Sequence, residues 1–211
     1  MAFLGDLFLA GNDFYNGDYK CGIAYVLSEK STISRKIDFE DERWEIELLS
    51  GSTYVVARTK DKISYEDLQA IGFSLIQKAL DIISVTGYLS AILMNPEISS
   101  VGVYHKDNKL ILFVYELTRM PIGGGIELAL TDSNGSIIPT PEQINPIWNE
   151  SFRYYRLSQS SNDQFEAYRN LFLAFEALLN FICPKKRSEG EVVWLKRVSY
   201  AEKTVQLNLV N

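Results

Sequence analysis

The sequence predicts an α+β fold in which an antiparallel sheet with one long helix is followed by a small helical module. Short runs rich in β-branched and aromatic residues dominate the first part of the chain, which is typical of strands. Beyond about residue 140, apolar residues recur at intervals of three and four, which is the helical period. Hydrophobic residues make up 46% of the 211 positions, enough to fill a substantial core. We therefore predict two parts, residues 1–140 and 141–211.

The first part begins with an apolar segment, residues 1–11, that has no basic start and is interrupted by Asp6. This pattern favours a first strand over a signal peptide. Residues 101–117 predict a hairpin that turns at Asp107 and Asn108, because both residue types tolerate the backbone of a tight loop. Further strands are predicted at residues 21–28, 43–49, 53–58 and 125–131.

Acidic residues are concentrated in one run, residues 38–47, which holds six carboxylates in ten positions. Within this run Glu45 and Glu47 alternate with apolar residues, which predicts a strand with one face in water. A cation site would need carboxylates that converge from fixed positions. We interpret the run instead as a solvated edge of the sheet that resists aggregation.

One long helix is predicted between the strands. Ser64 is the expected N-cap, and Glu66 and Asp67 place negative charge in the first turn, where it favours the helix dipole. From there to about Ser90 the apolar residues cover a broad arc of the helix. So wide an apolar face predicts a helix that lies across the sheet and not at its rim.

A segment with three prolines, residues 131–146, is the predicted boundary between the two parts. Two helices are predicted beyond it, at residues 146–159 and 162–182. Asp163, followed three residues later by Glu166, forms a start similar to a capping box for the second of them.

The predicted helix 162–182 carries a continuous apolar seam that is suited to packing against another helix. A polar stripe of Arg169, Glu176 and Asn180 is predicted opposite the seam. Few residues follow that could cover the seam, so we expect it to meet the first part of the chain, a second copy or another protein. The seam, called the aromatic seam below, consists of Phe165, Tyr168, Phe172, Phe175, Leu179 and Ile182.

Charge and composition argue against several classes of function. Residues 1–140 hold 12 Lys and Arg against 19 Asp and Glu, whereas residues 141–211 hold 9 against 8. Because phosphate binding needs clustered cations, a nucleic-acid surface is not expected in the first part. Cys21 and Cys183 are predicted to be buried thiols in a reducing compartment. No apolar run approaches the roughly 18 residues of a membrane span, so we expect a cytoplasmic protein without membrane contact.

Few residues have the spacing of a reaction centre. His105 is the only histidine, and no cysteine or carboxylate stands at metal-ligand spacing from it, so neither a metal nor a cofactor is predicted. We interpret His105 as a surface strand residue. The glycine-rich segment 121–127 lacks the Lys-Ser/Thr of a phosphate loop and is interpreted as a turn. The cations that a nucleic acid would contact are Arg153, Arg156, Lys185, Lys186 and Arg187.

Three stretches of the second part carry a more specific pattern: FRYYRLS at 152–158, YRNLFLAFEAL at 168–178 and WLK at 194–196. Together they resemble the HEPN-like C-terminal region of bacterial proteins labelled methylamine-utilization MauJ-like. The resemblance covers roughly the last quarter to third of the chain.

The resemblance implies a helical bundle, which in HEPN domains is often dimeric and in many members is a metal-independent RNase. The family's motif is an Arg, commonly followed by a polar residue, with a His one to two helical turns further on. Arg169 and Asn170 resemble the start of this motif, but Ala174, Phe175 and Glu176 stand where the His is expected. The resemblance therefore implies a HEPN-like module without its catalytic His.

From these observations we expect a non-enzymatic binding or scaffolding subunit whose partner is another protein or a second copy. HEPN-like modules occur in bacterial antiviral and stress-defence systems, so the resemblance suggests that this protein acts in such a system. Two alternatives stay open. One is an RNA endonuclease that uses Arg169, Asn170 and Glu176, and the other is a nucleic-acid sensor that uses the five cations named above.

Overall fold

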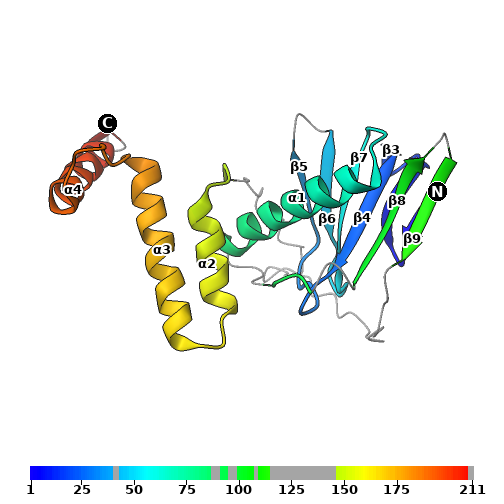
Figure 1. Ribbon diagram of the computed structural model, residues 1–211, viewed down its shortest axis with the longest axis horizontal. Helices are drawn as coiled ribbons and strands as arrows, with labels where there is room; N and C mark the ends of the chain where they lie inside the picture. Colours follow the sequence, from blue (N-terminus) through cyan, green and yellow to red (C-terminus); the bar gives the residue numbers. More distant parts are fainter. Residues whose placement is uncertain (40–42, 87–90, 95–98, 107–108, 115–145, 209–211) are drawn as a thin grey trace, which may run out of the picture. The chain divides into compact units, whose positions relative to one another are not determined.

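The computed structural model describes residues 1–39, 43–86, 91–94, 99–106, 109–114 and 146–208 (Figure 1). The chain divides into two compact units, Met1–Ile147 and Trp148–Asn211, and each is described by itself. The predicted α+β class is confirmed, with antiparallel sheets and one long helix in the first unit. Four predictions fall on residues outside the described ones: the turn at Asp107 and Asn108, the glycine-rich segment 121–127, the strand 125–131 and the boundary up to residue 145.

A six-stranded antiparallel sheet forms the centre of the first unit, with the strand order β5-β6-β7-β4-β8-β9. The predicted hairpin is confirmed, because β8 and β9 pair in antiparallel with Lys106 opposite Lys109. The strands are β4 (Cys21–Val26), β5 (Arg35–Phe39), β6 (Trp44–Leu48), β7 (Tyr54–Thr59), β8 (Ser100–Lys106) and β9 (Lys109–Val114).

A smaller sheet of β1 (Ala2–Leu4), β2 (Leu7–Asp13) and β3 (Gly17–Tyr19) lies against one face of the large sheet. The apolar N-terminal segment thus forms two strands, which turn at Gly5 with a φ of 60°. The middle strand β2 contacts β4, β7 and β8. Its apolar side chains fill a core cluster that consists of Leu7, Leu9, Ala10, Ala24, Val56, Val101 and Val103.

The long helix α1 (Tyr65–Val85) crosses the other face of the sheet, as predicted (Figure 1). The side chain of Ser64 accepts a hydrogen bond from the Asp67 N–H at 3.1 Å, which confirms the predicted N-cap. The helix ends at Val85 and not near Ser90. Thr86 is the C-cap, and its N–H donates to the carbonyl of Ile83.

Two glycines allow both layers to lie close to the central strand β4. A Cβ atom on Gly22 would overlap the carbonyl oxygen of Leu9, so the backbone of β2 passes directly over this position. On the other face, a Cβ atom on Gly72 of α1 would come within 2.7 Å of the Ile23 side chain. Gly22 and Ile23 are neighbours in β4 and point to opposite faces, which places α1 and β2 on opposite sides of the sheet.

Among the described helices, α1 alone is long and apolar enough to cross a membrane, with a mean hydropathy of 1.3 over its apolar window. Charged residues such as Asp67, Lys78 and Asp81 interrupt its sequence, so it contains no unbroken apolar run. Over half of that window, 56%, is buried in the structure. Packing of its apolar arc on the sheet accounts for this composition.

Three helices make up the described part of the second unit: α2 (Glu150–Ser160), α3 (Gln164–Ile182) and α4 (Glu191–Asn208). The side chain of Asp163 accepts a hydrogen bond from the Glu166 N–H at 2.8 Å, which confirms the predicted start of α3. The end of α3 is joined to α4 by a small core of Cys183, Trp194 and Val198, and the Trp194 indole N–H donates to the Cys183 carbonyl at 2.7 Å. As predicted, Cys21 and Cys183 are buried free thiols.

We predict that Gly22→Ala lowers the free energy of unfolding by about 1–3 kcal/mol, because the methyl group would displace the β2 backbone. Gly190→Ala is the control, since a Cβ atom there meets nothing within 4 Å. Urea unfolding followed by circular dichroism measures both variants. Equal midpoints for Gly22→Ala and the unmodified protein would show that β2 does not pass so close to β4.

Candidate functional site

One face of α3 consists mainly of short side chains and packs against α2. Ala174 is buried, and Ala167, Asn170 and Ala177 are half-buried, at the spacing of three and four that defines a helix face, with the larger Leu173 half-buried beside them. Helices α2 and α3 contact each other along their lengths. Short side chains on this face let the two helix axes approach closely, so α3 buries small residues within the unit.

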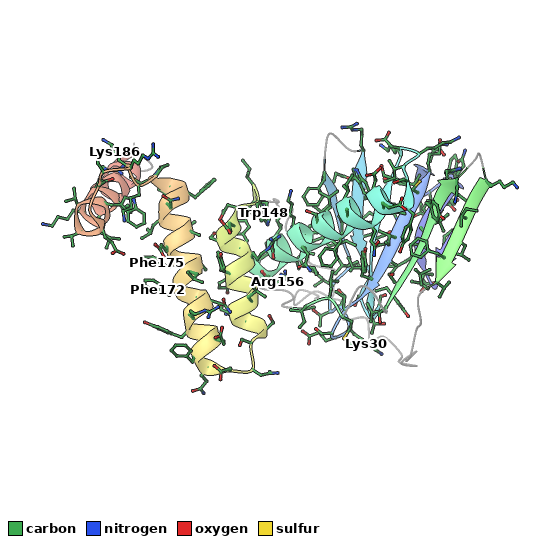
Figure 2. All side chains as sticks on the ribbon, in the orientation of Figure 1. Lys30, Trp148, Arg156, Phe172, Phe175 and Lys186 are labelled. Atoms are coloured by element: carbon green, nitrogen blue, oxygen red, sulfur yellow. The ribbon has the colours of Figure 1, made fainter. Side chains whose placement is uncertain are left out.

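The aromatic seam lies on the side of α3 that points away from α2, as Phe172 and Phe175 show in Figure 2. Five of its six residues are exposed, with exposed fractions between 53% and 73%. Leu179 is the exception, because it is half-buried against the core of Cys183, Trp194 and Val198. The largest apolar side chains of α3 are therefore left outside the core of the second unit.

The polar stripe was predicted opposite the aromatic seam, and this placement is wrong. At about 100° per residue, Arg169 and Glu176 lie directly beside the seam, while the face opposite it holds the short residues that contact α2. Arg169 forms an exposed ion pair with Glu166 at 3.4 Å, one helical turn away. Asn180 accepts a hydrogen bond from the Lys185 N–H at 3.0 Å and so helps to end the helix.

The three residues proposed for RNA cleavage do not converge within one chain. Arg169 and Glu176 are exposed and about 10 Å apart along the helix axis, whereas Asn170 is half-buried on the face toward α2. A cleavage site needs its acid, base and charge-stabilising groups within reach of one phosphodiester. The arrangement in a single chain does not provide this.

Of the five predicted nucleic-acid contacts, only the consecutive residues Lys185, Lys186 and Arg187 are exposed. The Arg153 guanidinium lies 5.6 Å from the ring centre of Trp148, and the Lys185 ammonium lies 5.8 Å from that of Trp194. Arg156 is buried, with 2% of its surface exposed. Only Lys186 and Arg187, in the loop after α3, are exposed without such an aromatic neighbour among the described residues. These positions do not form a row of exposed cations along one helix.

A compact ion pair holds the loop between α3 and α4. The Arg197 guanidinium donates to both carboxylate oxygens of Glu189, at 2.9 and 2.6 Å, and to the carbonyl of Pro184 at 2.8 Å. The Lys186 N–H donates to the same carboxylate at 3.0 Å. Hydrogen bonds from Arg197 and then from the Lys186 backbone lower the pKa of Glu189 from 4.5 to about 2. Sequence spacing gave no signal for this pair, because its members lie on either side of a helix start.

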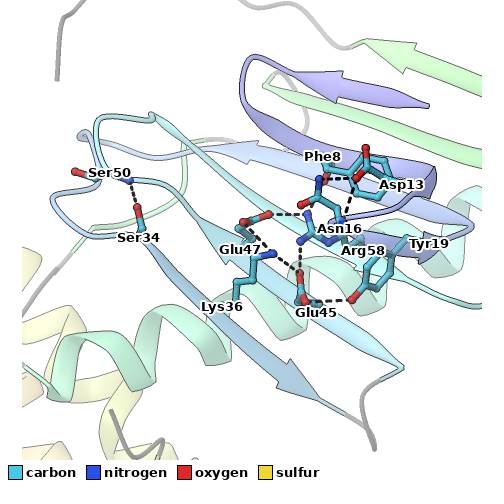
Figure 3. A network of polar contacts seen from close by, with 10 residues as sticks. All are labelled: Phe8, Asp13, Asn16, Tyr19, Ser34, Lys36, Glu45, Glu47, Ser50 and Arg58. Carbon is cyan, nitrogen blue, oxygen red and sulfur yellow. Dashed lines mark hydrogen bonds and ion pairs between the residues drawn. The ribbon is translucent and has the colours of Figure 1, made fainter. Parts of the chain in front are cut away.

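A second polar cluster lies inside the first unit, between the two sheets (Figure 3). Arg58 of β7 is fully buried, and its guanidinium donates to the Phe8 carbonyl at 2.7 Å and to Glu47 at 2.6 Å. It also pairs with Glu45. Phe8 and Tyr19 lie against the guanidinium, with ring centres 5.6 and 5.0 Å from it. The smaller sheet thus covers a buried charge of the larger one.

For Glu45 and Glu47 the interpretation as a solvated edge is wrong, whereas Asp38 is exposed on the edge strand β5 and residues 40–42 lie outside the described ones. Strand β6, which carries Glu45 and Glu47, lies between β5 and β7, and both side chains are largely shielded from water, with 14% and 8% of them exposed. Lys36 lies 3.7 and 3.4 Å from the two carboxylates. The cluster therefore balances two cations against two anions, which fits an internal structural network better than a site for an added ion.

The cluster also shifts the ionisation of its members. Burial lowers the pKa of Arg58, but the charges of Glu47 and Glu45 more than offset this and raise it. Tyr19 donates from its hydroxyl to Glu45 at 3.1 Å. Burial, followed by the charge of Glu45, raises the pKa of Tyr19 to about 12. Arg58 thus keeps its positive charge, and the Tyr19 hydroxyl keeps the proton that it donates to Glu45.

His105 lines an open pocket of about 320 Å³ between the β2–β3 turn region and β8–β9. Its Nδ1 atom is buried and has no hydrogen-bond partner among the described residues. Lys20 and Lys62 also line this pocket, but Asp18 lies 2.6 Å from Lys20 and neutralises it. The lining therefore lacks a convergent set of charges that would select one class of ligand.

Comparison of the chain with protein-family models, with curated proteins and with solved structures finds no match. The resemblance of the second unit to HEPN-like modules stays a prediction. The exposed aromatic seam of α3 is the candidate site that the geometry favours, because it is the largest group of apolar side chains left uncovered on one described helix.

We predict that Arg58→Met lowers the free energy of unfolding by about 3–5 kcal/mol, because it leaves Glu45 and Glu47 buried without their main partner. Lys36→Met, which removes a half-exposed cation of the same cluster, is the control and should cost less than about 1 kcal/mol. Urea denaturation measures both. Similar losses for the two variants would show that burial of Arg58 does not set the stability of the cluster.

We predict that the ion pair of Glu189 stabilises the second unit at pH values above 4.5, and that this stabilisation is lost as the pH falls toward 2. Stability is lost on acidification and not gained, because the pKa of Glu189 in the folded protein lies below its ordinary value. The difference in thermal midpoint between the unmodified protein and Glu189→Gln should therefore shrink over this range. Glu191→Gln removes the same charge from α4 and is the control. A difference that stays constant with pH would contradict the assignment.

Proposed function

We propose that the protein is a non-enzymatic binding or scaffolding subunit that contacts a protein partner through the aromatic seam of α3. The observation that supports this is the inverted packing of α3, which turns short residues toward α2 and leaves large apolar ones exposed. Monomeric proteins rarely leave a contiguous apolar face of this kind in water.

The energetics favour a protein as the partner. Each Phe or Leu side chain that passes from water into a packed interface contributes about 1.5–3 kcal/mol, and the seam offers several in one line. Aromatic side chains are also enriched at the centres of protein–protein interfaces, where charged ones are depleted. A nucleic acid would instead need more exposed cations than the three consecutive ones, Lys185, Lys186 and Arg187, supply.

The cellular role follows from the resemblance alone. HEPN-like modules accompany bacterial antiviral and stress-defence systems, and in such a system a module without its catalytic His would recruit or position other components. Its place of action would be the cytoplasm.

The test is the mass of the native complex. We expect the tagged protein, purified from its own cells, to elute in a complex that is lost in the double variant Phe172→Glu and Phe175→Glu. Phe14→Glu with Tyr15→Glu is the matched control, because these two aromatic residues are 94% and 88% exposed but lie in the first unit. Native size-exclusion chromatography with light scattering measures the mass.

Two results would contradict this proposal. One is an unchanged complex in the Phe172 and Phe175 variant. The other is RNA cleavage by the purified protein that is lost in Arg169→Ala, which would establish the endonuclease alternative. For that alternative Glu176→Gln is the informative second variant, because a general base at this position would lose its function with the charge.

A further inference from the structure

We propose that the edge strand β9 is a second binding surface, which takes an extended segment of another protein as an added antiparallel strand. This segment carries apolar side chains at alternate positions and acidic ones at its C-terminal end. The proposal concerns the first unit and is independent of the aromatic seam of α3. It comes from the residues of β9, from the limit of the smaller sheet beside it and from the charges at its start.

Strand β9 is an edge without the usual protection. It is the outermost strand of the large sheet and pairs only with β8 among the described residues (Figure 1). Five consecutive apolar residues, 110–114, make up most of it, and its register with β8 runs without a bulge. The opposite edge, β5, exposes the charged side chains of Lys36 and Asp38. Natural edges resist the addition of a strand through such charges, prolines or bulges, and β9 has none of them between residues 110 and 114.

The face of β9 next to the smaller sheet is apolar and exposed. Leu112 lies opposite Val103, and Val114 lies opposite Val101, so all four share one face. Both β8 valines are buried in the core under β2, with at most 5% exposed, whereas Leu112 and Val114 are 63% and 57% exposed. The cover that the smaller sheet provides therefore ends at β8. Leu110, which is 48% exposed, completes a row of three apolar side chains that alternate side chains of an added strand can contact.

A pocket at one end of this row fits a side chain of the added strand. It is the open pocket of about 320 Å³, which Leu110 and His105 line from the large sheet and Asn12 and Tyr19 line from the smaller one. Because its lining lacks a convergent set of charges, it suits an uncharged side chain. Strand-addition sites combine backbone hydrogen bonds with pockets for alternate side chains, and β9 offers both.

The lysines at the start of β9 define the charge of the ligand. Lys106 and Lys109 lie directly opposite each other in the β8–β9 pair, where like charges are unfavourable. Both are exposed, and neither pairs with a carboxylate among the described residues. Lys62, which lines the pocket beside Leu110, adds a third cation at this end. Acidic side chains of a ligand would offset these charges.

The direction of the added strand follows from the sheet. Every described pair of neighbouring strands in the large sheet is antiparallel, so an added strand that continues this pattern runs against β9. Its C-terminal end then lies beside Lys109, which is why the acidic residues of the ligand belong at that end.

The test uses a synthetic peptide and the purified full-length chain. The peptide alternates threonine with leucine over six positions and ends in two aspartates, so its three leucines share one face. We expect saturable binding by fluorescence anisotropy. Leu112→Glu places a charge in the middle of the apolar row and should weaken binding at least about tenfold. Ile71→Glu is the matched control, because it adds the same charge at an exposed apolar position of α1.

The charges at the end of the peptide test its direction. A peptide with the two aspartates moved to the N-terminal end should bind the unmodified protein more weakly. The double variant Lys106→Glu with Lys109→Glu should reverse the preference, so that a peptide ending in two lysines binds better than one ending in two aspartates. Circular dichroism checks that each variant folds, which is expected because these side chains are exposed.

Absence of binding by the unmodified protein, or equal binding by Leu112→Glu, would overturn the proposal. A disulfide that forms between Leu112→Cys and Leu128→Cys would assign the edge to residues 125–131 of the same chain instead. A dimer that Leu112→Glu dissociates in analytical ultracentrifugation would assign it to a second copy. The double variant Phe172→Glu and Phe175→Glu should bind the peptide as the unmodified protein does, so failure of this proposal leaves the proposed function of the aromatic seam standing.

Discussion

The burial of one guanidinium organises the first unit. Arg58 lies between the two sheets, out of contact with water, and a charge in such a place costs several kcal/mol unless it is fully paired. Its partners come from β6, through Glu45 and Glu47, and from β2, through the Phe8 carbonyl. A shift of β2 along the large sheet would remove the carbonyl from the charge. The cluster therefore fixes the position of the smaller sheet, which apolar contacts alone would leave less specific.

Whereas the first unit buries most of its large apolar side chains, the second unit leaves most of those on α3 exposed. Its central helix turns mainly short residues, together with Leu173, toward α2, so the helix pair buries only a modest apolar area of α3. At the end of the unit, Arg197 ties Glu189 and Pro184 to α4. Helix caps and a terminal ion pair thus contribute to order in this unit, while most of the aromatic seam of α3 stays exposed.

Local signals in the sequence predicted local structure well. Ser64 and Asp163 act as helix caps because the groups that they bind lie within one turn of the chain. The roles of Glu45 and Glu47 were not predictable in this way. Alternation along a strand shows which residues share a face, but it does not show what covers that face. Their partner Arg58 lies on the neighbouring strand β7, and Tyr19, which donates to Glu45, comes from β3, so only the tertiary fold brings these groups together.

The contact between Phe8 and Arg58 joins residues that are 50 positions apart in the chain. During synthesis, at about 5–20 residues per second, β2 therefore exists for seconds before β7 is made. In that interval its apolar side chains have neither the core of the large sheet nor the charge to which its carbonyl binds. Completion of β7 is thus the earliest moment at which the smaller sheet can lock in place. The buried guanidinium makes the order of synthesis part of the folding mechanism of this unit.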